Sequence, residues 1–312
     1  MRVSIITPCY NAAPYIQRTI ASVQAQTISD WEMIIVDDGS TDNSVSVVQA
    51  IAAKDSRIRI IQKPNGGTAS ARNKGLECVQ GEYIQFLDAD DELAADKFEK
   101  QLAIMEAKHL DVSYTDYRKL NADGSTEDIL GLNESLFHLL LGWGVWGTLP
   151  LHCFLYTKKF IQTNNLAFST TIREREDWDW HIKVFAAHPK TQRLKNYCGA
   201  LYFKSPTGKT SDGNVQKVHW GTCRFLYYRI QNSRNLGISL ALLVRLSLEL
   251  LTMALQATRY HIKNMFRIEN TFQGIYGVLT IIYAILLLPI SIPIYVGAFI
   301  YNHHIISSSQ NK

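Results

Sequence analysis

The sequence lacks several features that would assign it to a common class of protein. Charged residues make up only 19% of its 312 residues, against about 25% in typical soluble proteins, and its mean hydropathy is close to zero. This balance excludes a disordered chain, a collagen, a coiled coil and a polytopic membrane protein. The P-loop pattern G-x-x-x-x-G-K-[ST] is absent as well, which excludes that mode of phosphate binding.

Regularly paired cysteines are also missing. The cysteines are odd in number and form no C-x-x-C pair; they are Cys9, Cys78, Cys153, Cys198 and Cys223. A disulfide framework and a zinc ribbon both need a regular set of pairs. The pattern therefore argues against both and favours a reducing compartment.

Acidic and basic residues are distributed unevenly along the chain. Residues 1–128 contain 13 Lys and Arg and 20 Asp and Glu, a net charge of −7, while residues 129–312 have a net charge of +11. The basic excess is concentrated in 183–267, where 14 basic residues accompany only two acidic ones. Such a block suits an anionic partner, which is a nucleic acid, an anionic membrane surface or a phosphorylated lipid.

A long run without charge follows the basic block. Residues 270–302 contain no charged side chain, and a membrane-spanning helix needs about 20 apolar residues. Pro289 and Pro293 interrupt the run, so a kinked span and a re-entrant hairpin are both open, with a buried core helix as the alternative. We therefore expect a hydrophobic membrane segment at 270–302 and a polar tail at 303–312.

The residues before this segment predict how the chain is oriented. Lys263 and Arg267 precede the charge-free run, and positive residues favour the cytoplasmic side of a membrane. Residues 217–269 combine basic and apolar stretches, which predicts amphipathic helices at the membrane surface. We therefore expect a protein of the cell membrane with its N-terminal bulk on the cytoplasmic side. The adjacent membrane segment and the lack of a recognition motif argue against a nucleic-acid partner.

The first 120 residues alternate apolar strands with amphipathic helices. Short buried strands are predicted at residues 3–7, 33–36, 58–61 and 83–87. Helical patterns fall between and after them, at residues 13–26, 42–54, 69–79 and 94–108. Regular β-α alternation predicts a parallel sheet with helices on both faces, in which ligands bind beyond the carboxyl ends of the strands.

Polar residues follow three of these predicted strands. TPCYN at 7–11, VDDGSTD at 36–42 and FLDADDE at 86–92 would meet at one edge of the sheet. Five carboxylates would share this crevice, at a cost unless a cation or hydrogen-bond donors compensate: Asp37, Asp38, Asp88, Asp90 and Asp91. The Asp88-Ala89-Asp90 arrangement suits a hard divalent ion, and helix capping is its alternative role.

A second cluster, NGGTASARNKG at 65–75, places two glycines before a predicted helix. Backbone N–H groups at such a helix start are aimed at an anion, and Arg72 and Lys74 add positive charge. An ordinary turn into a helix is the alternative interpretation of this cluster.

The series TPCYN, VDDGSTD, NGGTASARNKG and FLDADDE resembles the nucleotide-sugar-binding half of the family 2 glycosyltransferases. The likeness is close over residues 1–120 and looser to about residue 185, with the motifs in the family's order and spacing. It implies the A-type glycosyltransferase fold, a Rossmann-like, mostly parallel α/β sheet flanked by helices. The expected helical, membrane-associated C-terminal extension would follow this fold.

The resemblance implies roles for the residues at the strand ends. It assigns the nucleotide sugar to Pro8, Tyr10, Asp37, Asp38, Arg72, Asp88 and Ala89. Within this set, Asp38 would accept a hydrogen bond from uracil and Arg72 would help to hold the donor. Asp90, with Asp88 as a second candidate ligand, would hold Mn²⁺ or Mg²⁺ on the diphosphate.

The family also places a carboxylate base at the start of a helix in its second half, and EREDWDWHIKVF at 174–185 fits that pattern. The resemblance assigns the base to Asp177, with Glu176 and Asp179 as supporting candidates. Acidic residues at a helix start also favour the helix dipole, which is the alternative role. The expected acceptor-side residues are Trp178, Trp180 and His152, and a structural role is the alternative for His152.

One departure from the family concerns the loop that follows the base helix. Many relatives carry a histidine there that approaches the metal or the diphosphate, whereas YFKSPTGKTS at 202–211 contains none. Lys204 or Lys209 would engage the diphosphate instead.

These inferences divide the chain into five expected parts. They are a nucleotide-sugar-binding half at 1–120, an acceptor-binding and catalytic-base half at 121–216, surface helices at 217–269, the membrane segment at 270–302 and the tail at 303–312. The expected activity is transfer of a sugar from a UDP-sugar to a hydroxyl of a lipid-linked or glycan acceptor, by a metal-assisted inverting displacement. The alternatives are a nucleotidyltransferase and a catalytically inactive, membrane-anchored scaffold that binds nucleotide sugars.

Overall fold

A computed structural model describes residues 2–121, 123–129, 150–172 and 175–203, together with four isolated positions between 226 and 246. The chain divides into two compact units, Met1–Gly213 and Asn214–Lys312, and the account below concerns the first. No helix within the described ranges has the length and apolar character needed to cross a membrane. The predicted membrane segment at 270–302, the tail at 303–312 and nearly all of 217–269 lie outside those ranges.

The N-terminal half consists of the predicted β-α units. Its parallel strands are β1 (Val3–Cys9), β2 (Trp31–Asp37), β3 (Ile58–Gln62) and β4 (Tyr83–Phe86). Its helices are α1 (Ile16–Gln24), α2 (Ser44–Ala52), α3 (Thr68–Leu76) and α4 (Lys97–Lys108). All four predicted strands and all four predicted helices are confirmed. The apolar runs in β1 and β2 are buried over their full length, as expected for strands inside a parallel sheet.

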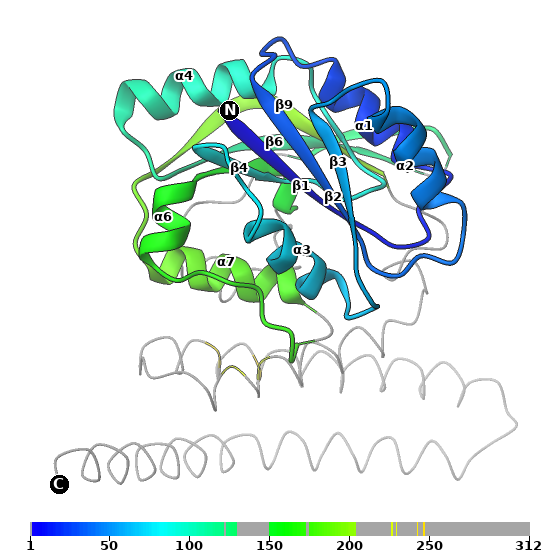
Figure 1. Ribbon diagram of the computed structural model, residues 1–312. Helices are drawn as coiled ribbons and strands as arrows, with labels where there is room; N and C mark the ends of the chain where they lie inside the picture. The colour runs from blue at the N-terminus through cyan, green and yellow to red at the C-terminus, as the bar shows by residue number, and fades with distance from the viewer. Residues whose placement is uncertain are drawn as a thin grey trace, which may run out of the picture. The chain divides into compact units, whose positions relative to one another are not determined.

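The second half of the unit adds strands that run in both directions. They are β5 (Glu92–Leu93), β6 (Val112–Leu120), β7 (Thr126–Ile129), β8 (Phe154–Thr157) and β9 (Thr191–Phe203). The remaining elements are the 3₁₀ turn η1 (Leu151–Cys153) and helices α6 (Lys158–Thr163) and α7 (Glu176–Ala186). In Figure 1, α1, α2 and α4 lie along one side of the sheet, and α3, α6 and α7 lie along the other.

The strands form one sheet in the order β3-β2-β1-β4-β8-β6-β9-β5, with β7 beside β6. Four of the pairings between described strands are parallel and four are antiparallel. The expected α/β sheet with flanking helices is therefore confirmed, but the expectation that it is mostly parallel is wrong. The sheet is mixed because β8 runs antiparallel to both of its neighbours, β4 and β6, and because β5 and β7 run antiparallel to β9 and β6, whereas β6 and β9 pair in parallel.

The strand order changes direction between β1 and β4, and this change positions the site. From β1 the chain passes outward through β2 to β3, and then returns to pair β4 with the other edge of β1. In such α/β sheets a crevice opens beyond the carboxyl ends of the two strands at the reversal. The segment after β1 and the aspartate-rich segment after β4 are therefore expected to lie beside each other.

Helix α3 packs unusually closely against β1. A methyl group added at Gly75 of α3 would meet the Cγ2 atom of Ile6 at 2.4 Å, well inside van der Waals contact. Gly75 is buried, and Ile6 has no exposed surface. This closeness holds α3, which carries Arg72 in its middle turn, against β1.

We predict that Gly75→Ala destabilises the protein. Overpacking costs about 1–3 kcal/mol, and the better helix propensity of alanine returns about 1 kcal/mol, so we expect a net loss of about 1 kcal/mol. Urea unfolding would measure it as a lower midpoint at an unchanged slope. Lys74→Ala, at an exposed neighbouring position, is the control, and equal midpoints for the two variants would contradict the prediction.

Candidate active site

The glycine turn before α3 faces a carboxylate of the protein itself. The backbone N–H groups of Gly66 and Gly67 donate to Asp38 Oδ1 at 3.0 Å and to Asp38 Oδ2 at 2.7 Å. Lys63 Nζ also donates to this carboxylate, and Asn65 Nδ2 donates to the Asp38 carbonyl at 3.0 Å. The turn was expected to face an anion, and the anion that it faces in this structure is the side chain of Asp38.

The residues beside Asp38 border the same crevice. Asp37 is buried at the end of β2, where its Oδ2 accepts a hydrogen bond from the Ser40 N–H at 3.3 Å. Pro8 is buried, whereas Tyr10 is 53% exposed, the only large hydrophobic side chain in the described ranges that is open to solvent. An exposed aromatic ring next to two buried carboxylates is a suitable surface for stacking a planar base.

Arg72 joins the aspartate-rich segment to the base helix. Its guanidinium is buried, donates from Nη2 to Asp88 Oδ1 at 2.7 Å and has Nη1 3.6 Å from Glu176 Oε1. Burial alone would raise the pKa of Asp88, but the Arg72 charge outweighs it and the pKa is lowered. Asp88 is therefore ionised at neutral pH and is held in place by a permanent cation.

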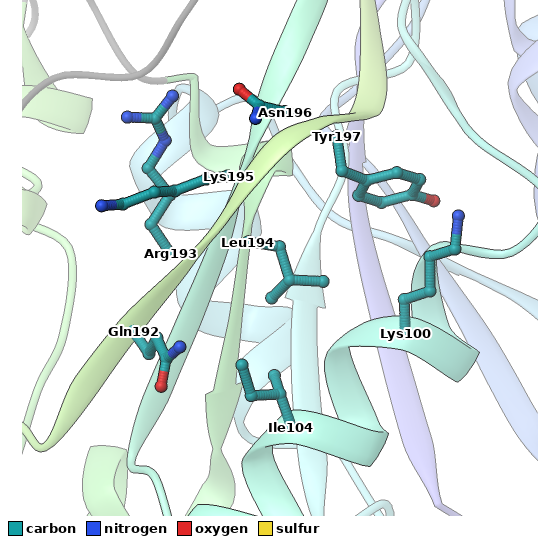
Figure 2. Close-up of a pocket in the computed structure, with 8 residues that line it drawn as sticks. All are labelled: Lys100, Ile104, Gln192, Arg193, Leu194, Lys195, Asn196 and Tyr197. Atoms are coloured by element: carbon teal, nitrogen blue, oxygen red, sulfur yellow. The ribbon is translucent and has the colours of Figure 1, made fainter.

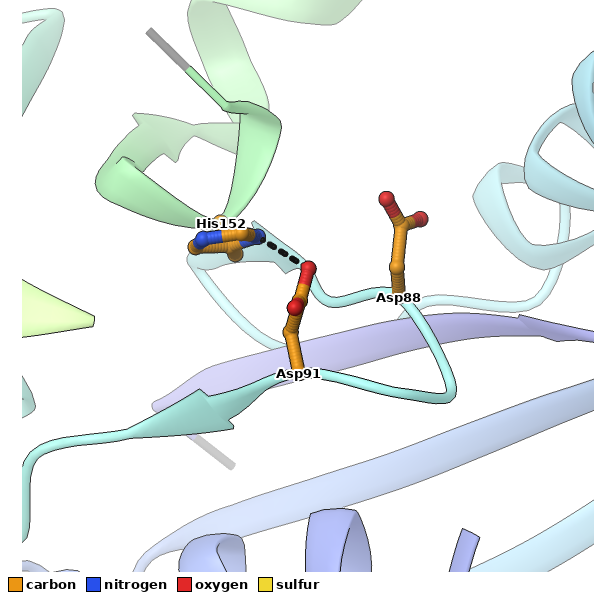
Figure 3. A group of neighbouring side chains, drawn as sticks. All are labelled: Asp88, Asp91 and His152. Carbon is orange, nitrogen blue, oxygen red and sulfur yellow. Dashed lines mark ion pairs between the residues drawn. The ribbon is translucent and has the colours of Figure 1, made fainter. Parts of the chain in front are cut away.

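A tight turn follows β4 and brings Asp88 and Asp91 together. The Asp91 N–H donates to the Asp88 carbonyl at 3.2 Å and closes the turn. Asp91 Oδ2 lies 3.0 Å from His152 Nδ1, and Asp91 Oδ1 accepts a hydrogen bond from the Phe203 N–H at 2.9 Å. One ligand atom each from Asp88, Asp91 and His152 lies within 4.8 Å of the others, as Figure 3 shows.

The chemistry of these three side chains fits a divalent cation. Two carboxylates and one imidazole are ligands that divalent metal ions accept in proteins. His152 is fully buried, and its Nε2 atom makes no hydrogen bond within the described ranges. Buried polar atoms are normally satisfied, but His152 Nδ1, which faces Asp91 Oδ2 at 3.0 Å, also lacks a well-aligned hydrogen bond within the described ranges, and a cation bound between these groups would satisfy it. Asp88, Asp91 and His152 are the residues that could hold it.

Asp90, the predicted first metal ligand, is not a member of this group. Its carbonyl is held by Arg18 Nη2 at 2.6 Å, and the adjacent Ala89 carbonyl is held by Thr19 Oγ1 at 2.8 Å. Burial, followed by the charges of Asp91 and Asp88, raises the pKa of Asp90 to about 7. The Asp-x-Asp pattern predicted that Asp88 and Asp90, two residues apart, bind the metal together. The turn after β4 instead brings Asp88 close to Asp91, three residues further along the chain.

Asp177 lies in the first turn of α7, as predicted. The Trp178 N–H donates to Asp177 Oδ1 at 2.8 Å, and Arg175, in the left-handed conformation with φ of +66°, begins the helix. Burial and then the charge of Glu176 raise the pKa of Asp177 to about 6. A carboxylate with a pKa near 6 is a better proton acceptor than an ordinary aspartate and is still ionised at neutral pH.

The other residues predicted around the base are buried in the core. Asp179, the supporting candidate, is 0% exposed and pairs with Lys183 at 2.8 Å on the same helix. Trp180 is stacked on Phe168 with ring centroids 4.2 Å apart, and its Nε1 donates to the Tyr156 hydroxyl at 3.1 Å. These side chains have no surface to offer to an acceptor.

All three residues predicted for the acceptor side are buried in this structure. Trp178 is 1% exposed, and neither Trp180 nor His152 has any exposed surface. The two tryptophans are two residues apart on α7 and so point to different sides of the helix, and both are buried because burying an indole ring is strongly favourable. Lys204 and Lys209, proposed for the diphosphate, lie outside the described ranges.

A separate pocket lies between α4 and β9, away from these residues. It has a volume of about 720 Å³, and Figure 2 shows Ile104 and Leu194 at its centre. None of the predicted site residues lines it. Two of its charged residues are already paired, Lys100 with Asp96 and Arg193 with Asp116, so the strand-end crevice is the better candidate for an active site.

Comparisons with known proteins agree with this choice. The chain matches the model of glycosyl transferase family 2 over residues 4–163, just over half of its length, and it belongs to this family. It is 32% identical over 218 residues to EpsJ, an uncharacterized glycosyltransferase of Bacillus subtilis, covering 64% of this chain and 60% of that protein. It is 46% identical over 127 residues to TuaG, a putative teichuronic acid biosynthesis glycosyltransferase of the same organism, covering 40% and 50%.

Solved structures show the same fold. The crystal structure of S. aureus TarS 1–349 in complex with UDP-GlcNAc is similar with a TM-score of 0.61 and 20% identity, over 91% of this chain and 81% of that one. The complex of the same protein with UDP has a TM-score of 0.58 over 80% of this chain and 71% of that one. The matches span 60% of the length of EpsJ and 50% of the length of TuaG.

Sequence reasoning missed two members of the candidate metal group. Asp91 was seen as part of the acidic crevice but not as a ligand, because the Asp-x-Asp pattern drew attention to Asp90. His152 is distant in sequence, and the spacing alone does not show that η1 lies against the turn after β4. The contact between Glu176 and Arg72 likewise had no signal beyond their opposite charges.

We predict that Glu176→Gln lowers the pKa of Asp177, because the Glu176 charge is one of the causes that raise it. Carboxyl ¹³C chemical shifts measured against pH would report the titration, with the Asp177 signal assigned through its loss in Asp177→Asn. Glu82→Gln, at an exposed position away from α7, is the control. An unchanged or raised pKa for Asp177 in Glu176→Gln would show that the two carboxylates do not interact.

Proposed function

We propose that this protein is an inverting glycosyltransferase that uses a UDP-sugar as donor. The observation that carries the proposal is the connection through Arg72, which pairs with Asp88 on the donor side and with Glu176 beside Asp177. Arg72 thus connects the segment after β4, which would bind the donor, to the start of α7, which carries Asp177 with its raised pKa. The complexes of TarS with UDP and UDP-GlcNAc support a UDP-linked donor for a chain of this fold.

The chain's own residues supply most of the proposed mechanism. Tyr10 and Pro8 border the nucleobase, and Asp38 accepts a hydrogen bond from uracil once its carboxylate is released from part of its present contacts. Arg72 and Asp88 hold the donor beyond the end of β4. With the donor held in this way, the acceptor hydroxyl would attack the anomeric carbon from the side opposite the diphosphate.

Asp177 acts as the base in this proposal. It takes the proton from the acceptor hydroxyl while that oxygen bonds to the anomeric carbon and the bond to the diphosphate breaks. A single displacement inverts the anomeric configuration, so an α-linked donor gives a β-linked product. A divalent cation, Mn²⁺ or Mg²⁺, held by Asp88, Asp91 and His152 would neutralise charge on the departing UDP.

We further propose a lipid-linked or glycan acceptor and a position at the cytoplasmic face of the cell membrane. The sequence supports this through the basic block at 183–267 and the charge-free run at 270–302. Among the relatives, TuaG has a putative role in teichuronic acid biosynthesis, and a chondroitin synthase of Pasteurella multocida is 45% identical over 124 residues, 39% of this chain and 13% of that enzyme. Family membership disfavours the nucleotidyltransferase alternative.

We predict that the purified chain releases UDP from one member of a panel of UDP-sugars in the presence of Mn²⁺ and that EDTA abolishes this release. The metal is needed because three carboxylates lie at the site where the diphosphate must bind. A coupled UDP assay would measure turnover, and calorimetry with UDP would measure donor binding in the same samples. Absence of both UDP release and UDP binding would contradict a UDP-linked donor and favour the scaffold alternative or another donor, whereas binding without release would indicate that the acceptor is missing from the assay.

We predict that Asp177→Asn lowers turnover by about 10²- to 10⁴-fold, the usual contribution of a general base, without changing the affinity for UDP. In the wild-type protein kcat/KM should fall as pH drops through about 6, because the pKa of Asp177 is raised to about 6 and only its ionised form accepts a proton. Asp123→Asn, in an exposed turn, is the matched control. A pH profile that is flat from pH 5 to 8 would exclude Asp177 as the base.

A further inference from the structure

A lysine is buried in the core behind the candidate metal group. Lys97, the first residue of α4, has no exposed surface, and its Nζ donates to Gln85 Oε1 at 2.6 Å and to Gln101 Oε1. Both acceptors are uncharged amides, and both glutamines are themselves fully buried. Burying an ammonium group costs several kcal/mol, and a buried polar group replaced together with its partners by apolar side chains is often equally or more stable. Lys97 therefore needs an explanation other than stability.

The two glutamines connect Lys97 to the 3₁₀ turn η1. Because each Oε1 faces Lys97, each Nε2 must point the other way. Gln85 Nε2 donates to the His152 carbonyl at 3.1 Å and to the Phe86 carbonyl at 2.5 Å. Gln101 Nε2 donates to Ser113 Oγ at 2.8 Å and contacts the Cys153 carbonyl at 3.4 Å. Lys97 thus sets which end of each amide faces the turn.

The turn that these amides hold carries His152. A 3₁₀ segment of three residues has little hydrogen bonding of its own, so its position depends on outside contacts. Gln85 also belongs to β4, which leads directly into the turn at residues 88–91. The same side chain therefore ties His152 to the strand that supplies Asp88 and Asp91.

We propose that Lys97, Gln85 and Gln101 are positioning residues that fix η1 and thereby place the His152 imidazole beside Asp88 and Asp91. This inference rests on the metal site of the proposed function. The three residues act through the backbone of η1 and do not contact the side chains of the metal ligands. Burial lowers the pKa of Lys97 to about 7. Because the ammonium form has three N–H donors and the neutral amine still has two, both glutamine contacts can be made in either form.

The test is Mn²⁺ binding by the full chain, measured by calorimetry for the wild type and for Lys97→Met. Methionine keeps the length of the side chain but offers no donor, so both glutamine amides lose the contact that orients them. We expect Mn²⁺ to bind about 10- to 100-fold more weakly, the usual effect of removing a partner that orients a metal ligand. Thermal unfolding should show a lower midpoint, because two buried glutamine oxygens lose their donor, and a single cooperative transition would show that the variant is folded.

Gln85→Glu provides a second variant that keeps an acceptor for Lys97 but removes the N–H donor to the His152 carbonyl. It should weaken Mn²⁺ binding while the protein remains folded. Lys100→Met, which removes an exposed lysine from the same helix, should bind Mn²⁺ like the wild type. Unchanged Mn²⁺ affinity in folded Lys97→Met and Gln85→Glu would overturn the inference while leaving the proposed function intact.

The wild-type and His152→Ala measurements separate this inference from the proposed function. Saturable Mn²⁺ binding by the wild type that His152→Ala weakens is the expected result. If the wild type does not bind Mn²⁺, or if His152→Ala binds Mn²⁺ as tightly as the wild type does, the proposed metal group is wrong. The positioning role of Lys97, Gln85 and Gln101 is then wrong as well.

Discussion

The candidate site depends on one buried cation, the guanidinium of Arg72. It pairs with Asp88 after β4 and with Glu176 at the start of α7, and it is itself carried by α3. Three elements that are distant in sequence are thereby fixed around one group. Arginine suits this position because its guanidinium stays charged when buried and offers donors in several directions. Removing one partner of such a buried pair leaves an uncompensated charge, which typically costs about 3–5 kcal/mol.

The aspartates around Arg72 differ because their surroundings differ. Asp38 accepts hydrogen bonds from two backbone N–H groups and a lysine, whereas Asp88 pairs with Arg72, which lowers the pKa of Asp88. Asp177 is buried beside Glu176, and Asp90 lies beside two other carboxylates, so their pKa values are raised to about 6 and about 7. In the proposed function, the same residue type therefore binds the donor where hydrogen-bond donors surround it and accepts a proton where they do not.

The crowding of carboxylates after β4 also gives a reason for the polar core behind them. A turn with three aspartates is held by Arg18 and Thr19 on one side and by the contact between Asp91 and His152 on the other. The Lys97, Gln85 and Gln101 group fixes the backbone on which His152 stands. A site that gathers like charges needs such a rigid frame, because electrostatic repulsion would otherwise open the turn.

The sequence by itself determined the β-α units of the first 120 residues, the strand-end motifs and the place of Asp177 at a helix start, because hydrophobic periodicity and glycine turns are local signals. Only the tertiary structure decided the direction of β8, the burial of Trp178 and Trp180, and the meeting of His152 with Asp91. It also decided that Asp91 joins Asp88 where Asp90 was expected. Pairing between distant strands and the choice of which helix face is buried depend on packing across the whole unit, which no local pattern in the sequence records.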